Sequence, residues 1–556
     1  MRTSMMKFVL VPSVLAASLA LIGCGGSDNK SSAASATAGS AKIDPNVLAD
    51  KQELVINNGT EPATLDPHKA EGNVELNLIR QMFDGLLSTD RDGKTIAGIA
   101  EKWESPDNKV WTFHLRDAKW SNGDPVTAED FVYSFRRLVD PKTASPYATY
   151  LDDARVVNAK AVIDGKAKPE DLGVKAIDAK TFQVTLSEAV PYFPDMLVHG
   201  IMRPVHKATV EKFGDKWTDP ANIVVNGAFK PTQWNVNDKI VMERNASYYD
   251  NASNKINKVT YLALNDGTSD LARYRAGEID MSSANFPDEQ FAAVKQEMGD
   301  QLTIGPSLCT YYYAFNMAKP PFNDPRVRKA LVMTLDRETF TKKVMNDRGE
   351  KPAYQFTPTS IAGGVKFEPE WKSWDQNKRV EEAKKLLTEA GYSQANPLKF
   401  ELLYNTDEGH KKYAIAASEM WKQFLGGAVS TSLVNQEWKT FLETRRKGNY
   451  QMARAGWCGD FNEGATFLNI FKSTSTNNDL GYKSEAFDNI LAQSLAVGAN
   501  RVDAYNKAEA QLSQDNPALF VYHYISISLN KPYVLGVSHN DPLHNSQVKY
   551  YSIAKH

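Results

Sequence analysis

The N-terminal segment constrains this chain more than any other feature, because it determines the compartment in which the chain folds. Residues 1–7 carry Arg2 and Lys7 and no acidic residue, and an apolar run of about 15 residues, 8–22, follows. A basic start with an apolar run of this length is typical of a secretory signal, whereas a membrane span needs ~20 residues. We therefore interpret residues 1–23 as a signal peptide and expect the rest of the chain to fold outside the cytoplasm.

The end of the apolar run predicts a lipid anchor. Leu21-Ile22-Gly23-Cys24 resembles the bacterial lipobox, in which a peptidase cleaves before the cysteine and the thiol is lipidated. Residues 24–43 are rich in Gly, Ser and Ala and predict a flexible linker. A chain lipidated at Cys24 would be tethered to a membrane surface rather than span it. An ordinary signal peptide followed by a chance cysteine is the alternative.

Two further cysteines, Cys309 and Cys458, remain once Cys24 is assigned to the lipid. In an exported chain an even residual pair suggests a disulfide, here closing a long loop. Two buried free thiols are the alternative. No His or Cys lies near either residue at ligand spacing, so we expect no metal site.

Size and charge limit the class of protein. Residues 44–556 are too many for one core and indicate two or three domains. Removal of residues 1–23 takes away two basic residues and no acidic one, which moves the net charge from −2 to about −4. This near-neutral balance gives no reason to expect nucleic acid or an anionic bilayer as a partner.

Local patterns predict both strands and helices. Trp111, Phe113 and Leu115 alternate with polar residues, which is typical of a half-buried strand, and Asn122-Gly123 predicts a tight turn. The segment 309–316 is a second expected strand, with a helix from about Pro325. The mixture favours an α/β (mixed α+β) fold.

Two helices have recognisable ends. Thr127 followed by Asp130 predicts a capped start, with Phe131, Phe135 and Leu138 at helical spacing. A stripe from Val380 to Ala390 stops at Gly391, which is a natural helix end; the stripe consists of Val380, Ala383, Leu387 and Ala390.

Longer segments resemble the peptide/nickel class of solute-binding proteins, and the similarity extends from about Leu54 to His556. The signature lies in 101–105, 111–116 and 119–131. The oligopeptide-binding branch of the class is matched by 58–61 with 65–68, 143–147, 308–313, 433–442 and 454–458.

This resemblance implies a two-lobed, three-domain periplasmic-binding-protein fold that closes about a hinge. Lobe I would consist of residues 44–83, 208–308 and 526–556, domain II of residues 84–207, and lobe II of residues 309–525. It also implies a disulfide between the cysteines at 309 and 458, capture of oligopeptides largely independent of sequence, and their delivery to the membrane permease of an ABC importer. The protein would be a monomer, in the periplasm or cell envelope, with no cofactor.

A receptor of this kind must bind the features that all peptides share, which are the ammonium, the backbone and the carboxylate. Asp460 matches the ammonium-binding aspartate of the class; its alternative role is a local cap. The strands 454–458 and 309–313 would pair with the extended peptide. Backbone and pocket contacts are expected from Glu71, Tyr147, Tyr312, Trp438, Leu442, Gly456, Trp457 and Cys458, and carboxylate contacts from Arg445, Arg454 and His410. Core packing, salt bridges or solvated positions are the alternatives for these residues.

One position departs from the class. A lysine expected to meet the carboxylate of the peptide falls on Met345, within Lys342-Lys343-Val344-Met345-Asn346. Lys342, Lys343 or Arg348 would have to substitute, in a different register, so the preferred peptide length does not follow from the resemblance.

The sequence contains none of the enzyme motifs that we sought, neither Gly-x-Ser-x-Gly, His-Glu-x-x-His, a Walker motif nor a dinucleotide fingerprint. An enzyme is therefore disfavoured. The same fold could instead take a murein-derived peptide or haem. Nickel is disfavoured because no ligands cluster, and a periplasmic chaperone would need an exposed apolar surface.

Overall fold

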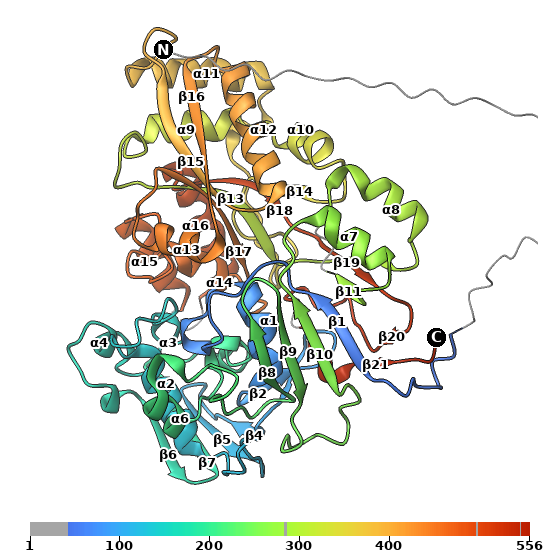
Figure 1. Cartoon of the computed structure of the whole chain (residues 1–556). Coiled ribbons are helices and arrows are strands. Elements are labelled where there is room, and N and C mark those ends of the chain that lie inside the picture. Colours follow the sequence, from blue (N-terminus) through green and yellow to red (C-terminus); the bar gives the residue numbers. More distant parts are fainter. Residues whose placement is uncertain (1–42, 283–285, 496–498, 545) are drawn as a thin grey trace, which may run out of the picture. The chain divides into compact units, whose positions relative to one another are not determined.

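The computed structural model describes residues 43–282, 286–495, 499–544 and 546–556 (Figure 1). The predicted signal peptide, Cys24 and the linker up to residue 42 lie outside them. Within those ranges, no helix has both the length and the apolar character that crossing a bilayer requires.

The first large sheet combines strands from both ends of the sequence. Its seven strands have the order β12-β19-β11-β1-β10-β9-β8. β1 pairs in parallel with β10 and β11, and β19 returns antiparallel between β11 and β12. The bounds are β1 Glu53–Asn57, β8 Phe229–Asn235, β9 Lys239–Arg244, β10 Lys258–Leu262, β11 Met281–Ser282, β12 Leu302–Gly305 and β19 Ser526–Asn530.

The second large sheet has six strands in the order β14-β18-β13-β17-β15-β16. Its bounds are β13 Cys309–Phe315, β14 Lys351–Pro352, β15 Leu398–Asn405, β16 Val429–Gln436, β17 Met452–Cys458 and β18 Ala518–His523. Every residue of β13 is buried, because both faces of the sheet are covered. Tyr311 and Tyr313 pack with Trp421 on one face, and Tyr312 belongs to the core on the other.

A four-stranded antiparallel sheet lies in the stretch predicted as domain II, in the order β4-β5-β7-β6. Its bounds are β4 Ala100–Glu104, β5 Val110–Leu115, β6 Val174–Asp178 and β7 Thr181–Thr185. Helix α2, Ala128–Val139, packs on this sheet through Phe131 and Phe135, which contact Phe182 of β7.

The remaining principal helices are α1 Asn73–Met82, α6 Lys207–Phe213, α7 Gly267–Arg275, α8 Phe291–Glu297, α9 Pro325–Thr334, α11 Gln376–Glu389, α12 Glu408–Phe424, α13 Trp438–Arg446, α15 Glu485–Ser494 and α16 Arg501–Asp515. Helix α1 begins at the cavity described below, and α13 lines it.

The chain passes between the two large sheets twice, at residues 306–308 and at residues 524–525. The two passages are joined where the amide of Tyr524 donates to the carbonyl of Cys309 at 3.0 Å. The predicted lobe boundaries fall at these passages, and the division into lobes remains a prediction.

The local sequence predictions agree with the structure. Trp111, Phe113 and Leu115 are the buried residues of β5, and Gly123 turns with a φ of 96°. Thr127 and Asp130 form the capping box of α2. Helix α11 ends at Glu389, and Gly391 follows with a φ of 89°. The expected strand at 309–316 is β13, one residue shorter, and the expected helix at Pro325 is α9.

Candidate ligand-binding cleft

A cavity of about 440 Å³ lies between segments that belong to different sheets. Its walls come from the start of α1, from Tyr147 and His199, from the ends of β13 and β17, from α13, and from residues 524–527. All of the predicted binding residues line it: Glu71, Tyr147, Tyr312, His410, Trp438, Leu442, Arg445, Arg454, Gly456, Trp457, Cys458 and Asp460. Residues up to 389 positions apart in sequence, Glu71 and Asp460, thus meet at one cavity.

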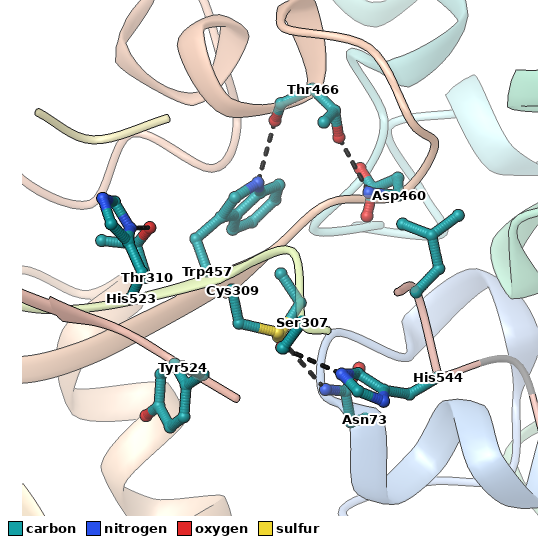
Figure 2. Close-up of a disulfide and its surroundings, with 12 residues drawn as sticks. Asn73, Ser307, Cys309, Thr310, Trp457, Asp460, Thr466, His523, Tyr524 and His544 are labelled. Atoms are coloured by element: carbon teal, nitrogen blue, oxygen red, sulfur yellow. Dashed lines mark hydrogen bonds between the residues drawn. A yellow bond between two sulfur atoms is a disulfide. The ribbon is translucent and has the colours of Figure 1, made fainter. Parts of the chain in front are cut away.

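Asp460 is a buried carboxylate that contacts an imidazole and a hydroxyl. Only 8% of the residue is exposed. Its Oδ1 lies 3.1 Å from His199 Nε2 and accepts a hydrogen bond from the hydroxyl of Tyr147 at 3.3 Å. Its amide donates to Thr466 Oγ1 at 2.8 Å, which fixes the backbone (Figure 2). Burial and the charge of Asp460 raise the pKa of Tyr147 well above its usual value, so this hydroxyl stays protonated and donates.

Trp457 packs beside this carboxylate. Its indole stacks on Tyr147, with ring centroids 6.0 Å apart and planes 23° apart. The indole Nε1 donates to the carbonyl of Thr466 at 2.8 Å (Figure 2). Thr466 therefore holds both the indole of Trp457 and the backbone of Asp460 in place.

The disulfide between Cys309 and Cys458 is present, as the resemblance implied. The two residues are direct partners across β13 and β17. Asn73 at the start of α1 donates to Cys458 Sγ at 3.4 Å, so the sulfur also contacts the opposite wall (Figure 2).

The two strands differ in what they offer to a ligand backbone. β13 pairs with β17 along its whole length and with β18 through Thr310–Ala314. It therefore has no free edge there, and the expectation that residues 309–313 pair with a peptide is wrong. β17 pairs with β15 only at Met452 and Ala453, so the other edge of residues 454–458 carries no strand. Only β17 retains an edge for an added strand.

Two acidic residues of the α1 side contact α13. Glu71 forms an ion pair with Arg446. Glu75 accepts hydrogen bonds from the amides of Ala63 and Gly72, at 2.7 and 3.0 Å, and from Trp438 Nε1 at 3.2 Å. Burial raises the pKa of Glu75 to about 7.

The three predicted carboxylate-binding residues have unequal surroundings. Arg445 pairs with the buried Asp479 at 3.0 Å. Arg454 donates to Asn405 Oδ1 at 3.2 Å and to the hydroxyl of Tyr524 at 3.1 Å, and no described carboxylate pairs with it. Burial, followed by the charge of Arg454, lowers the pKa of His410 to about 3, so this imidazole is neutral at pH 7.

Met345 does not reach the cleft. It is fully buried in the core of the six-stranded sheet. Of the possible substitutes, Lys342 pairs with Glu338, and Arg348 pairs with Asp288 at 2.7 Å and with Glu350. Neither these two nor Lys343 lines the cavity.

A larger cavity, of about 790 Å³, lies elsewhere, beside α2 and α6. It contains none of the predicted binding residues. At its base Arg137 and Asp66 pair at 2.6 Å, so their charges are mutually satisfied. We therefore place the candidate site in the 440 Å³ cavity, where Asp460 pairs with no described Lys or Arg and Arg454 pairs with no described carboxylate.

Sequence reasoning missed His199, Glu75, Arg80 and Asp479. Each is a single residue without a motif, and His199, Glu75 and Asp479 acquire their roles from contacts with other segments. The resemblance, which ran through the segment of Trp438, carried no signal for its partner Glu75.

Similarity to known proteins identifies the family of this chain. The family of bacterial extracellular solute-binding proteins, family 5, matches residues 94–479. The periplasmic oligopeptide-binding protein OppA of Salmonella typhimurium is 54% identical over 512 residues, which cover 92% of this chain and 94% of that protein. The fold and the cleft define a mixed α/β periplasmic-binding protein, a class that binds solutes and is not enzymatic. The chain belongs to family 5 of the bacterial extracellular solute-binding proteins.

Two solved proteins share this fold, and one of them was solved in an open form as well. The crystal structure of Haemophilus influenzae OppA in complex with RPPGFSPFR superposes with a TM-score of 0.90 at 47% identity, covering 91% of this chain and all of that one. The murein tripeptide-binding protein MppA of Escherichia coli is 44% identical. One of its structures superposes with a TM-score of 0.89 and covers 92% of this chain and 100% of the MppA chain. Its unliganded open form superposes with a TM-score of 0.64 and covers 92% of this chain and 99% of the MppA chain. The present structure is thus unlike the open form.

Proposed function

We propose that this protein captures oligopeptides outside the cytoplasm, in the periplasm, largely independent of sequence, and delivers them to the permease of an ABC importer. The observation that carries the proposal is the charge arrangement of the cleft. One cavity holds a buried carboxylate, Asp460, that contacts His199 and Tyr147 but no described Lys or Arg. It also holds a half-buried guanidinium, Arg454, that pairs with no described carboxylate. These charges complement the ammonium and the carboxylate of a peptide.

The relatives support this assignment. OppA of Salmonella typhimurium is an oligopeptide-binding protein by name, and the Haemophilus influenzae protein was solved in complex with the peptide RPPGFSPFR. In the proposed complex the free edge of β17 pairs with the peptide backbone, and Trp438, Leu442 and Trp457 face its side chains.

The test is a double-mutant cycle by calorimetry. Asp460→Asn keeps the shape of the side chain and removes its charge, and N-acetylation removes the charge of the peptide. If the two groups pair in the closed cleft, either change alone costs about 3–5 kcal/mol, and both together cost little more. Losses that simply add would show that Asp460 does not meet the ammonium. Asp117→Asn, an exposed residue outside the cleft, is the matched control.

A murein-derived peptide is distinguished in the same experiment. Its affinity would exceed that of unmodified alanine peptides of equal length if the cleft were built for it. Equal or lower affinity supports the general peptide receptor.

We also propose that Cys24 carries a lipid that holds the protein at a membrane. The support is the lipobox-like sequence 21–24. Cys24→Ser should release the protein from the membrane fraction and leave peptide affinity unchanged. Equal partition of the wild type and the variant would reject the anchor without affecting the transport role.

A further inference from the structure

Arg80 is a buried cation in the wall of the cleft that forms no ion pair with a described carboxylate. It lies on α1, is 9% exposed, and lines the cavity together with Leu76 and His544. Its single hydrogen bond among the described residues runs from Nη1 to Asn77 Oδ1 at 3.2 Å. Its Nε is buried without a partner, and no described carboxylate lies within ion-pair distance.

Other arginines with little exposure have a carboxylate partner or several carbonyl partners, although the Nε of Arg203 and of Arg445 is also buried without a partner. Arg337 makes four hydrogen bonds to backbone carbonyls. Arg203 contacts Asp84 at 3.3 Å and two carbonyls. Arg445 pairs with Asp479. Because a buried charge without a partner is costly, an unpaired guanidinium in a cavity wall indicates a place where a ligand supplies the anion.

The acceptor beside Arg80 is held in position. Asn77 donates to Asn58 Oδ1 at 3.1 Å, and Asn58 donates to the carbonyl of Val74 at 2.9 Å. This chain orients the amide oxygen of Asn77 toward the guanidinium. The remaining donors of Arg80 form the planar fork that suits a carboxylate.

The neighbours of Arg80 neutralise it only in part: the charge of Asp541, which forms no ion pair with Arg80, partly offsets the lowering of its pKa by burial. Burial, with the charge of Arg80 in second place, lowers the pKa of His544 to about 4, so that imidazole is uncharged at pH 7. Burial lowers the pKa of Arg80 itself to about 10, so the guanidinium remains charged at neutral pH. A second cavity, of about 440 Å³, shares Asn73, Val74, Ser526, Ile527 and His544 with the cleft and is also lined by Asn77, which leaves room for a side chain here.

We propose that Arg80 binds a second carboxylate of the ligand, supplied by an aspartate or glutamate side chain of the bound peptide, while Arg454 takes the terminal carboxylate. This rests on the proposed function and adds a preference to it. The receptor accepts many sequences but binds a peptide more tightly when an acidic residue lies opposite α1.

The probes are alanine tetrapeptides with Glu or the isosteric Gln at the second or third position, each as the free acid and as the C-terminal amide. For the wild type we expect the Glu peptide to bind about 10- to 100-fold more tightly than the Gln peptide at one of the positions, since a desolvated charged hydrogen bond carries that difference. In Arg80→Gln the ratio should fall to about one, and Arg80→Lys should retain part of it. Arg273→Gln, an exposed arginine of α7 paired with Glu278, is the control.

Each result has one meaning. If tetraalanine does not bind the wild type, the proposed function fails. If tetraalanine binds but the Glu peptide binds no more tightly than the Gln peptide at either position, the inference about Arg80 fails and the proposed function stands. This comparison uses the wild type only. An unchanged Glu-to-Gln ratio in Arg80→Gln also overturns it. Loss of the acid-to-amide difference in that variant would assign Arg80 to the terminus instead.

Discussion

The imidazole Nε2 of His199 lies 3.1 Å from Oδ1 of Asp460, and both residues are almost completely buried. Tyr147 donates to the same oxygen. With its proton on Nε2, His199 donates as well, so two aromatic donors orient one carboxylate. The second oxygen, Oδ2, then remains available to a ligand cation, and His199 acts as a positioning residue.

Removal of this imidazole should weaken peptides with a free amine. For His199→Ala we expect about a 3- to 10-fold loss of affinity, the worth of one hydrogen bond that orients the carboxylate. Acetylated peptides should lose much less, because they do not use the charge. Calorimetry with both peptides measures this, and His114→Ala, half-exposed on β5, serves as the control. Equal losses for both peptides would indicate general damage to the cleft.

Substitutions of Arg454 and Arg445 should separate binding from stability. Arg454 has no described carboxylate partner, so Arg454→Gln should reduce the preference for a free-acid peptide over its amide by about tenfold or more. The measurement is the ratio of the two affinities.

Arg445→Gln is the contrasting variant. It leaves Asp479 buried without its partner, and we expect a loss of about 3–5 kcal/mol in the free energy of unfolding with little change in the acid-to-amide ratio. If Arg445→Gln abolishes the ratio and Arg454→Gln does not, their roles are reversed.

The sequence could predict elements whose cause is local. The capping box of Thr127 and Asp130 is contained within four residues, and Gly391 adopts a φ of 89° that favours glycine. The resemblance added the residues of the cleft and the disulfide, which no local pattern supplies. Contacts such as Glu75 with Trp438 depend on segments far apart in sequence, so propensity and periodicity carry no information about them.

Strand pairing shows a second reason for error. The sequence of β13, Cys-Thr-Tyr-Tyr-Tyr-Ala-Phe, predicts a strand correctly. Burial does not reveal which neighbours occupy its edges, because any apolar strand suits an edge or a central position. The pairing with β18 comes from residues 518–523, about 200 positions away, and it closes the edge that was expected to receive a peptide.

Glu75 should make the stability depend on pH. Burial raises its pKa from 4.5 to about 7 in the folded chain, so the folded state binds the proton more tightly than the unfolded state. The free energy of unfolding therefore falls as the pH rises from about 4.5 to about 7, by about 3 kcal/mol, and is constant above.

Glu75→Gln removes this dependence. In denaturant unfolding, the difference between the free energies of unfolding of the variant and the wild type should grow by about 2–3 kcal/mol in favour of the variant from pH 5 to pH 8. Glu101→Gln, on the exposed part of β4, controls for the loss of one acidic group. A difference between variant and wild type that does not change with pH would mean that Glu75 does not titrate in this range.

The disulfide should stabilise the fold and contribute little to ligand binding. Cys309 and Cys458 are 149 positions apart, and closing so long a loop restricts the unfolded chain by up to about 5 kcal/mol. The strands that it joins already pair along their whole length, so the folded arrangement does not depend on the bond. We expect Cys309→Ser with Cys458→Ser to lower the free energy of unfolding by a few kcal/mol, and peptide affinity to change by less than about threefold.

Denaturant unfolding of the wild type with and without reductant should reproduce the loss, whereas the double variant should not respond to reductant. A double variant as stable as the oxidised wild type would show that loop closure contributes nothing, and a large loss of affinity would show that the bond holds β17 in register for the ligand.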